Sequence, residues 1–203
     1  DKRYMRIDGK LVFMIYKPLE FENLPKTMKL WNKLAQEEGL GGFYFIGYTV
    51  NIGGELQHLK ELGMDAITSC RLNRNTIKGV AWFWRKLISV VFHTPRRISY
   101  RKAIEEFKGL EEYADNVFPT LIPNWDHTPR SGINGDLLTH CTPSLFEQHA
   151  KNVFEQIKNK PDSKKIVFLK SWNEWGEGNY MEPDLKYGKG FIMALRNAKD
   201  KYE

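Results

Sequence analysis

The feature that most constrains the fold is an alternation of short apolar runs with longer amphipathic segments. Five runs rich in β-branched and aromatic residues predict buried strands, and they span Leu11–Lys17, Phe43–Tyr48, Met64–Ser69, Val117–Ile122 and Ile166–Leu169. Because helical patterns lie between them, consecutive strands are expected to run parallel with crossover helices. No linker or repeat divides the chain. The sequence therefore predicts an α/β fold in a single domain, residues 1–203.

Helix boundaries are read from apolar spacing and capping residues. Pro25 is well placed at the start of a helix that ends near Gly39, and Thr142 caps a second helix before Pro143. The Gly53-Gly54 pair is expected to form a turn. The remaining helices are expected over Glu55–Leu62, Val80–Phe92, Tyr100–Tyr113 and Tyr187–Tyr202, with a polar loop over Arg71–Gly79.

Composition limits the classes of partner. Of the 203 residues, 41% are hydrophobic and 28% are charged, which excludes a disordered chain. The formal charge of +6, from 31 basic and 25 acidic residues, favours anionic partners such as nucleic acid, phospholipid headgroups or nucleotide-sugar phosphates, and most of the basic residues are expected to be solvated surface. No nucleic-acid motif is visible, and Cys70 and Cys141 lack metal-ligand spacing. We therefore expect no nucleic-acid partner, no metal and no cofactor.

The sequence shows neither a signal peptide nor a membrane-spanning run. Its most apolar window, Val80–Phe92, carries Arg85 and Lys86 and is too short to cross a bilayer. The favoured interpretation is a helix packed beneath a long insertion. The alternative is peripheral membrane contact through residues 80–102, helped by Arg96 and Arg97. We expect a cytoplasmic protein, peripheral to the inner membrane under that alternative.

The last predicted strand leads into the stretch with the most reactive chemistry, Lys165–Tyr187. Two acids, Glu174 and Glu177, follow the strand among aromatic residues and glycines. Glycoside chemistry needs one carboxyl group that protonates the departing oxygen and a second that acts as base or nucleophile, with rings that stack on sugars. The plain alternative is a pair of solvated surface acids. The clustering favours the catalytic interpretation.

In α/β sheets, chemistry gathers where parallel strands end. Besides the glutamates, the candidate substrate-binding residues near these ends are Trp172, Asn173, Trp175, Trp125, Asp126, Arg130, Tyr48 and Tyr180. Trp172 and Trp175 either stack on sugar rings or belong to the core. Asp126 and Arg130 either pair with each other or contact sugar or phosphate. His127 is expected to be structural.

The run Trp172-Asn173-Glu174-Trp175-Gly176-Glu177-Gly178 resembles the signature of the glycoside hydrolase family 99-like proteins. In bacteria these include the WbsX-type glycosyltransferases of surface-polysaccharide biosynthesis. The resemblance continues through Glu182-Pro183-Asp184 and Tyr187-Gly188, and two weaker matches support it: Asp8-Gly9-Lys10 and the run from Pro123 to Arg130. Together these matches span nearly the whole chain.

The resemblance implies a (β/α)8 barrel in which this segment lies late. An eight-stranded barrel takes about 250 residues, and this chain supplies about five strands. We therefore expect the C-terminal portion of such a barrel, lacking the first two or three βα units. A truncated chain, completion by another chain, and an open α/β sheet all remain alternatives.

The resemblance also implies residue roles. Glu177 is the expected general acid, kept protonated by burial beside Trp175 or by the charge of Glu174. Glu174 is the expected base that removes a proton from the sugar's own 2-hydroxyl, which then attacks C1. The family prototypes act on α-mannosides and carry histidine at the position of Gly176, so the substrate here is open.

Three functions follow. The first is glycosyl transfer in the biosynthesis of lipopolysaccharide or another surface polysaccharide, with a nucleotide-sugar or lipid-linked substrate. The second is a retaining endo-α-mannosidase-like hydrolase acting on an oligosaccharide or polysaccharide. The third is an inactive carbohydrate-binding or scaffold protein.

Overall fold

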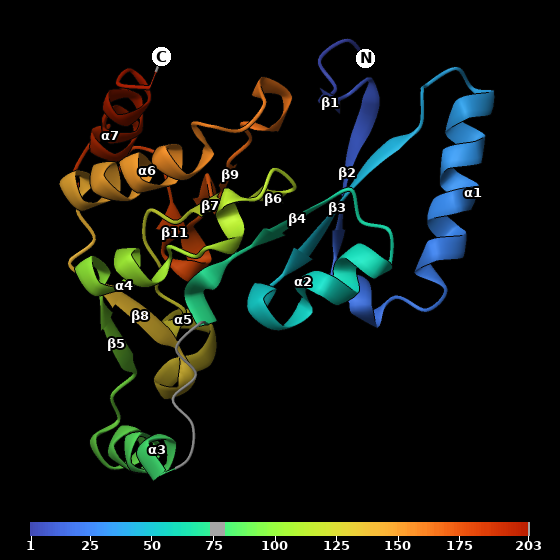
Figure 1. Ribbon diagram of the computed structural model, residues 1–203. Coiled ribbons are helices and arrows are strands. Elements are labelled where there is room, and N and C mark those ends of the chain that lie inside the picture. The colour runs from blue at the N-terminus through green and yellow to red at the C-terminus, as the bar shows by residue number, and fades with distance from the viewer. Residues whose placement is uncertain (74–79, 203) are drawn as a thin grey trace.

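A computed structural model describes residues 1–73 and 80–202. Its main feature is a curled parallel sheet (Figure 1) made of β2 (Lys10–Tyr16), β3 (Phe43–Thr49), β4 (Ala66–Ser69) and β6 (Val117–Phe118), and continued by β7 (Thr120–Leu121) and β9 (Phe168–Leu169). Every pairing among these strands is parallel, and their order in space follows their order in the chain. The sheet is therefore a half-barrel.

Pro119 explains why one predicted strand became two. Proline has no N–H to donate to a ladder, and β6 pairs with β4 on one side while β7 pairs with β9 on the other. The Pro119 carbonyl accepts a hydrogen bond from the Phe168 N–H at 3.0 Å. The segment 117–121 thus connects the two halves of the curled sheet. All five predicted strands are found, with shorter bounds at Met64–Ser69 and Ile166–Leu169.

Helices follow most strands, and their bounds are α1 (Leu24–Glu37), α2 (Ile52–Glu61), α3 (Val80–Phe92), α4 (Tyr100–Glu106), α5 (Thr128–Ser131), α6 (Pro143–Ile157) and α7 (Gly190–Lys199). Short 3₁₀ turns lie at Pro18–Glu20, Arg71–Asn73, Glu111–Tyr113, Gly132–Asn134, Asp162–Lys164 and Trp175–Glu177. A short strand, β1 (Arg6–Ile7), pairs antiparallel with β2 at the outer edge of the sheet. In the described part of the chain, no helix is long and apolar enough to span a membrane.

Three helix boundaries differ from the sequence-based prediction. α2 begins at Ile52, so Gly53-Gly54 lies in its first turn rather than in a separate turn, because Ile52 is buried in the core. α4 ends at Glu106 instead of Tyr113. α7 starts at Gly190 instead of Tyr187, because the Asp184 carboxylate accepts hydrogen bonds from the N–H groups of Lys186 and Tyr187.

The early end of α4 has an electrostatic cause. Arg71 is buried and pairs with Glu112 and, at 2.8 Å, with Glu111. Burial by itself disfavours the charged guanidinium, but the two carboxylates raise the pKa of Arg71. The chain must therefore turn at Gly109 so that both acids face Arg71. The predicted loop Arg71–Gly79 lies outside the described residues from position 74.

An insertion between β4 and β6 was predicted only in part. It contains α3 and then β5 (Arg96–Ser99), which pairs parallel with β8 (Asp136–Thr139). Neither β5 nor β8 was expected from the sequence. Figure 1 shows α3 standing away from the half-barrel at the far end of this small sheet. The favoured interpretation of a buried Val80–Phe92 helix is wrong, because seven of its described apolar side chains are exposed.

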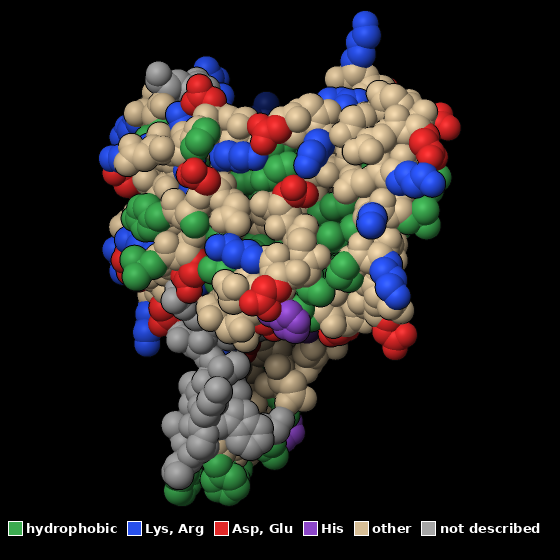
Figure 2. Space-filling view, turned by 45° about the vertical axis from the view of Figure 1, so that its right-hand side comes forward, with side chains coloured by type: hydrophobic (Ala, Val, Ile, Leu, Met, Phe, Trp, Pro, Cys, Tyr) green, Lys and Arg blue, Asp and Glu red, His purple; other side chains and the backbone are tan. Residues whose placement is uncertain are grey.

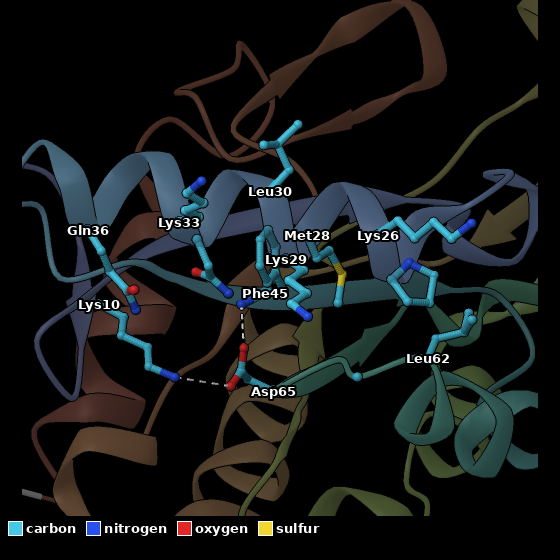
Figure 3. A pocket seen from close by; sticks show the side chains of 13 residues that line it. Lys10, Lys26, Met28, Lys29, Leu30, Lys33, Gln36, Phe45, Leu62 and Asp65 are labelled. Atoms are coloured by element: carbon cyan, nitrogen blue, oxygen red, sulfur yellow. Dashed lines mark hydrogen bonds and ion pairs between the residues drawn. The ribbon is translucent and has the colours of Figure 1, made fainter.

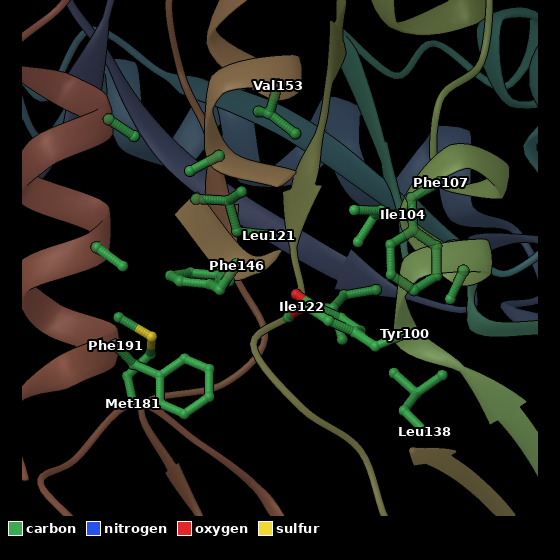
Figure 4. Close-up of a cluster of buried hydrophobic side chains, with 14 of the residues drawn as sticks. Tyr100, Ile104, Phe107, Leu121, Ile122, Leu138, Phe146, Val153, Met181 and Phe191 are labelled. Carbon is green, nitrogen blue, oxygen red and sulfur yellow. Dashed lines mark hydrogen bonds between the residues drawn. The ribbon is translucent and has the colours of Figure 1, made fainter. Parts of the chain in front are cut away.

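The largest core lies between the sheet and α4, α6 and α7 (Figure 4). Tyr100 is fully buried there, and its hydroxyl donates to the Ile122 carbonyl at 2.5 Å. His149 is also buried, and its Nε2 accepts the Ile122 N–H at 3.2 Å. Burial lowers the pKa of His149 to about 3, so the imidazole is neutral and free to accept. These contacts fix the segment that leads into the candidate site.

Candidate active site

The stretch after β9 forms a small hairpin at the carboxyl edge of the parallel strands. β10 (Asn173–Glu174) and β11 (Asn179–Tyr180) pair antiparallel around the 3₁₀ turn Trp175–Glu177. Gly178 follows with φ +49°, and a Cβ atom there would lie 2.8 Å from the Cβ of Asp126. Only glycine fits this left-handed position against the neighbouring segment.

Two asparagines fasten the hairpin to the strand ends, and the sequence analysis missed both. The buried Asn179 amide donates to the carbonyls of Asn124 (2.6 Å) and Lys170 (2.8 Å). The Asn124 side chain in turn accepts the Tyr180 N–H at 2.8 Å. The only signal was that both asparagines lie within the stretches singled out for other residues. The hairpin therefore has a fixed position relative to β7 and β9.

Asp126 is a structural residue in this arrangement. Its Oδ1 accepts from the N–H (2.9 Å) and hydroxyl (2.6 Å) of Thr128, at the start of α5. Its own N–H donates to the Glu177 carbonyl at 2.7 Å. Asp126 and Arg130 do not pair with each other, because Arg130 contacts the two glutamates; the alternative that they contact sugar or phosphate stays a prediction. Asp126 instead holds the second motif, which is the run from Pro123 to Arg130, against the hairpin.

Arg130 contacts both candidate catalytic acids. Its Nη1 lies 2.9 Å from Glu177 Oε1, and its Nη2 lies 3.3 Å from Glu174 Oε1. One guanidinium group thus spans two carboxylates and offsets their mutual repulsion. Since the planar fork fixes where each oxygen lies, Arg130 sets the spacing of the pair.

The two acids differ in exposure. The Glu177 side chain is 12% exposed, whereas the Glu174 side chain is 44% exposed. Two carboxyl groups in unlike surroundings are suited to unlike tasks, one donating a proton and the other accepting one. Sequence reasoning placed Trp175 beside Glu177; the side chains that contact the Glu177 carboxylate are Arg130 and His127.

His127 and Lys170 were not foreseen as site residues. His127 Nε2 lies 3.5 Å from Glu177 Oε1, and its Nδ1 is 3.1 Å from the Ser131 hydroxyl. The His127 ring stacks on Trp125, with centroids 5.7 Å apart. Lys170, at the end of β9, places its Nζ 5.3 Å from the centre of the Trp125 ring. Their place directly beside the two motifs was the available signal.

The aromatic residues of the hairpin are at the surface. Trp172 and Trp175 are about half exposed, which is unlike core tryptophans. The Trp175 ring stacks on Tyr180 with centroids 3.8 Å apart, and its Nε1 donates to Glu182 at 2.6 Å. Asn173 is exposed, and in the described residues its side chain forms no hydrogen bond with either glutamate.

Tyr48 lies near the end of β3 on the same edge. Its ring stacks on Tyr16, which ends β2, with centroids 5.3 Å apart. Its side chain is hydrogen-bonded to Cys70 beyond β4; burial raises the pKa of the Cys70 thiol, and this hydrogen bond partly offsets the rise. These contacts connect the rim from β2 to the end of β4.

One surface pocket adjoins the site. It has a volume of about 440 Å³ and is lined by Trp125, Asp126 and Tyr180, although neither glutamate is part of its lining. A larger pocket of about 820 Å³ lies between α1 and the amino ends of β2 and β4 (Figure 3). There, Lys10 Nζ is 3.7 Å from Asp65. Because Lys10 begins β2 and Asp65 precedes β4, this larger pocket is at the edge opposite to the site.

Within residues 1–73 and 80–202, no cluster of three or more His, Cys, Asp or Glu side chains is arranged to hold a metal ion.

Comparison with known proteins adds the family. The family model described as Glycosyltransferase WbsX matches residues 1–195. The chain belongs to the WbsX glycosyltransferase family. This confirms the resemblance drawn from the tryptophan- and glutamate-rich run. No solved structure matches the chain.

Two relatives of this WbsX-family chain come from two strains of Xanthomonas campestris pathovar campestris, and both carry the description "Uncharacterized protein WxcX". Each is 25% identical over 201 residues, which is 98% of this chain and 28% of the relative. The chain therefore spans just over a quarter of the length of these relatives.

Proposed function

We propose that this chain transfers glycosyl groups in the biosynthesis of lipopolysaccharide or another bacterial surface polysaccharide. The observation that carries the proposal is one guanidinium, from Arg130, between two glutamates of unequal exposure at the carboxyl edge of a half-barrel. Membership of a family named for glycosyl transfer supports the reaction class. The substrates proposed are a nucleotide sugar as donor and an oligosaccharide, polysaccharide or lipid-linked sugar as acceptor.

The proposed first step uses the free oxygen of each acid. Arg130 and His127 both contact Oε1 of Glu177, which leaves Oε2 as the oxygen proposed to pass a proton to the departing oxygen as its bond to C1 breaks. Glu174, held by Arg130 through Oε1, takes the proton of the sugar 2-hydroxyl. That oxygen then bonds to C1, which gives an anhydro-sugar.

The second step reverses these roles. Glu177 takes a proton from the acceptor hydroxyl, whose oxygen attacks C1 and opens the anhydro ring. The 2-oxygen recovers its proton from Glu174, so the configuration at C1 is retained overall. Trp172 and Trp175, half exposed beside the acids, are proposed to stack on sugar rings, with Trp125, Tyr48 and Tyr180 along the rim.

Hydrolysis is the second candidate, because water in place of the acceptor hydroxyl gives a retaining endo-α-mannosidase-like enzyme. One observation bears on the substrate. A Cβ at Gly176 would lie 3.3 Å from Glu174 Oε1, so glycine leaves room beside the proposed base where the prototypes of the resemblance carry histidine. A different sugar from that of the prototypes is proposed to fill this space.

The fold and location complete the proposal. Residues 1–203 are proposed to be one domain that contributes about five βα units to a (β/α)8 barrel, on the basis of the curled, sequentially ordered parallel sheet. The location proposed is the cytoplasm, peripheral to the inner membrane, where lipid-linked acceptors are found.

The test is incubation with nucleotide sugars and with mannan-type oligosaccharides, with products identified by mass spectrometry. An elongated acceptor supports transfer, and shortened oligosaccharides support the hydrolase. Binding without any product in either set contradicts both enzymatic assignments and identifies the third candidate, an inactive carbohydrate-binding protein.

A further inference from the structure

Helix α3 buries its described polar side chain and exposes its described apolar side chains. Its one described polar side chain, Ser89, is buried, with its hydroxyl 2.8 Å from the Thr94 carbonyl and 3.0 Å from the Ile133 carbonyl. Its described apolar side chains are all exposed, and these are Phe83, Trp84, Leu87, Ile88, Val90, Val91 and Phe92. A surface helix of a globular protein normally shows the reverse arrangement. Contiguous exposed apolar surface of this kind marks an interaction site.

The figures place this apolar face at a tip of the molecule. α3 stands beyond β5 and β8 at one end of the fold (Figure 1), and Figure 2 shows hydrophobic side chains at the end of that projection. A projecting tip can reach a flat surface without the half-barrel obstructing it.

The sequence segment that contains this helix is strongly basic. Residues 66–104 contain nine of the chain's 31 Lys and Arg residues and none of its 25 Asp and Glu residues. This segment therefore has a formal charge of +9, and the remainder of the chain has −3, which together give the net +6. Arg97, Arg101 and Lys102 are exposed, and they form no ion pair in the described part of the chain. The apolar face thus lies within a strongly basic segment.

We propose that α3 docks this protein on a bilayer that contains anionic lipid. An aliphatic and aromatic face within a basic segment is the composition of a helix that lies in the membrane interface. A length of 13 residues corresponds to about 20 Å of helix, too short to span a bilayer. A second copy of the chain is a poorer occupant, because it would bring the exposed cations Arg97, Arg101 and Lys102 of two copies close together.

Docking through α3 brings the candidate site near the lipid surface. The Ile133 carbonyl that faces Ser89 is three residues from Arg130, which contacts both glutamates. The carboxyl edge of the strands is therefore on the side of the molecule from which α3 projects (Figure 1). This inference rests on the proposed function, which includes a location peripheral to the membrane. It adds that α3 is the surface that contacts the bilayer.

The experiment is co-sedimentation of the full chain with phosphatidylcholine vesicles, with and without phosphatidylglycerol, at low and high salt. We expect binding only with phosphatidylglycerol, weakened by salt. The variant Leu87→Ser/Val91→Ser, and separately Arg97→Gln/Arg101→Gln/Lys102→Gln, are expected to bind roughly tenfold less. The control Leu30→Ser/Leu34→Ser removes exposed leucines from α1 and is expected to bind like the unmodified chain.

Circular dichroism checks that every variant is folded. Binding that is independent of phosphatidylglycerol, or equal in the α3 and α1 variants, overturns the proposal. Self-association that only the Leu87→Ser/Val91→Ser variant abolishes, without vesicle binding, also overturns it and identifies a second copy as the occupant. The vesicle assay measures no sugar transfer, so a failure of docking is distinct from a failure of catalysis.

Discussion

Arg130 is the residue on which the geometry of the candidate site depends. It lies on α5, and its two terminal nitrogens face one oxygen of each glutamate. The α5 start is in turn fixed by Asp126 through Thr128. Arg130 thereby joins two motifs that are more than 40 residues apart in the sequence into one site. The arrangement requires both glutamates together with Arg130.

The first prediction concerns this guanidinium. Arg130→Met is expected to lower turnover about 10²-fold, because the carboxylates lose their shared donor. Arg130→Lys is expected to recover little, since one ammonium cannot replace the two-pronged contact. Added guanidinium ion is expected to restore part of the turnover of the Met variant. Steady-state kinetics with and without the ion measure this.

The control is Arg196→Met, which breaks an exposed 3.6 Å pair with Asp200 far along the chain from the site. It is expected to leave turnover unchanged. Because the Arg130 side chain is 57% exposed, its loss is expected to change stability by less than about 1 kcal/mol. Full turnover in Arg130→Met, or a global loss of structure, contradicts the role assigned here.

At the scale of elements, the turn after α4 depends on a buried ion pair. Glu112→Gln removes one of the two carboxylates that compensate the buried charge of Arg71. The free energy of unfolding is therefore expected to fall by about 3–5 kcal/mol. The matched control is Glu105→Gln, whose pair with Lys108 is exposed and is expected to matter by less than about 1 kcal/mol. Urea unfolding compares the two. Equal effects would show that the Arg71 pair does not hold this turn.

Helix α6 contributes a pH dependence through His149. Its pKa is about 3 in the folded chain against 6.5 unfolded, so between these values the unfolded chain binds more protons. Stability from this group is therefore present above pH 6.5 and is lost as the pH falls, by up to about 5 kcal/mol near pH 3. His149→Gln is expected to flatten this part of the curve.

Urea unfolding across this pH range measures the effect, with His58→Gln as the control because His58 is exposed on α2. The control is expected to keep the pH dependence of the unmodified chain. An identical slope in His149→Gln and in the unmodified chain would show that this histidine is not buried in neutral form.

Elements that show a clear pattern in their own residues could be predicted from the sequence. Pairings between segments far apart in the sequence could not. The five parallel strands are apolar runs, so each was visible alone. β5 and β8 are short and partly polar, and Arg96 faces Asp136 only after 40 residues of chain fold back. Likewise Glu174 and Glu177 were predicted, while the contact of Glu177 with His127 exists only because the hairpin closes on the second motif.

At the scale of the whole molecule, the half-barrel separates two edges with different character. The carboxyl edge carries the acids, the exposed tryptophans and, beyond the small β5–β8 sheet, the apolar helix α3. The amino edge carries the lysine-lined pocket with Asp65. The chain covers 28% of the relatives' length, so the candidate site described here belongs to that matched portion.

The turnover of Glu177→Gln, compared with that of the unmodified chain on whichever substrate gives product, tests the account most directly. Loss of the proton donor is expected to lower turnover by roughly 10²–10⁴-fold, or about 3–5 kcal/mol of transition-state stabilisation. The control Glu37→Gln, on the exposed side of α1, is expected to turn over normally. A Glu177→Gln variant that is folded and as fast as the unmodified chain would contradict the claim that these paired acids perform glycosyl chemistry.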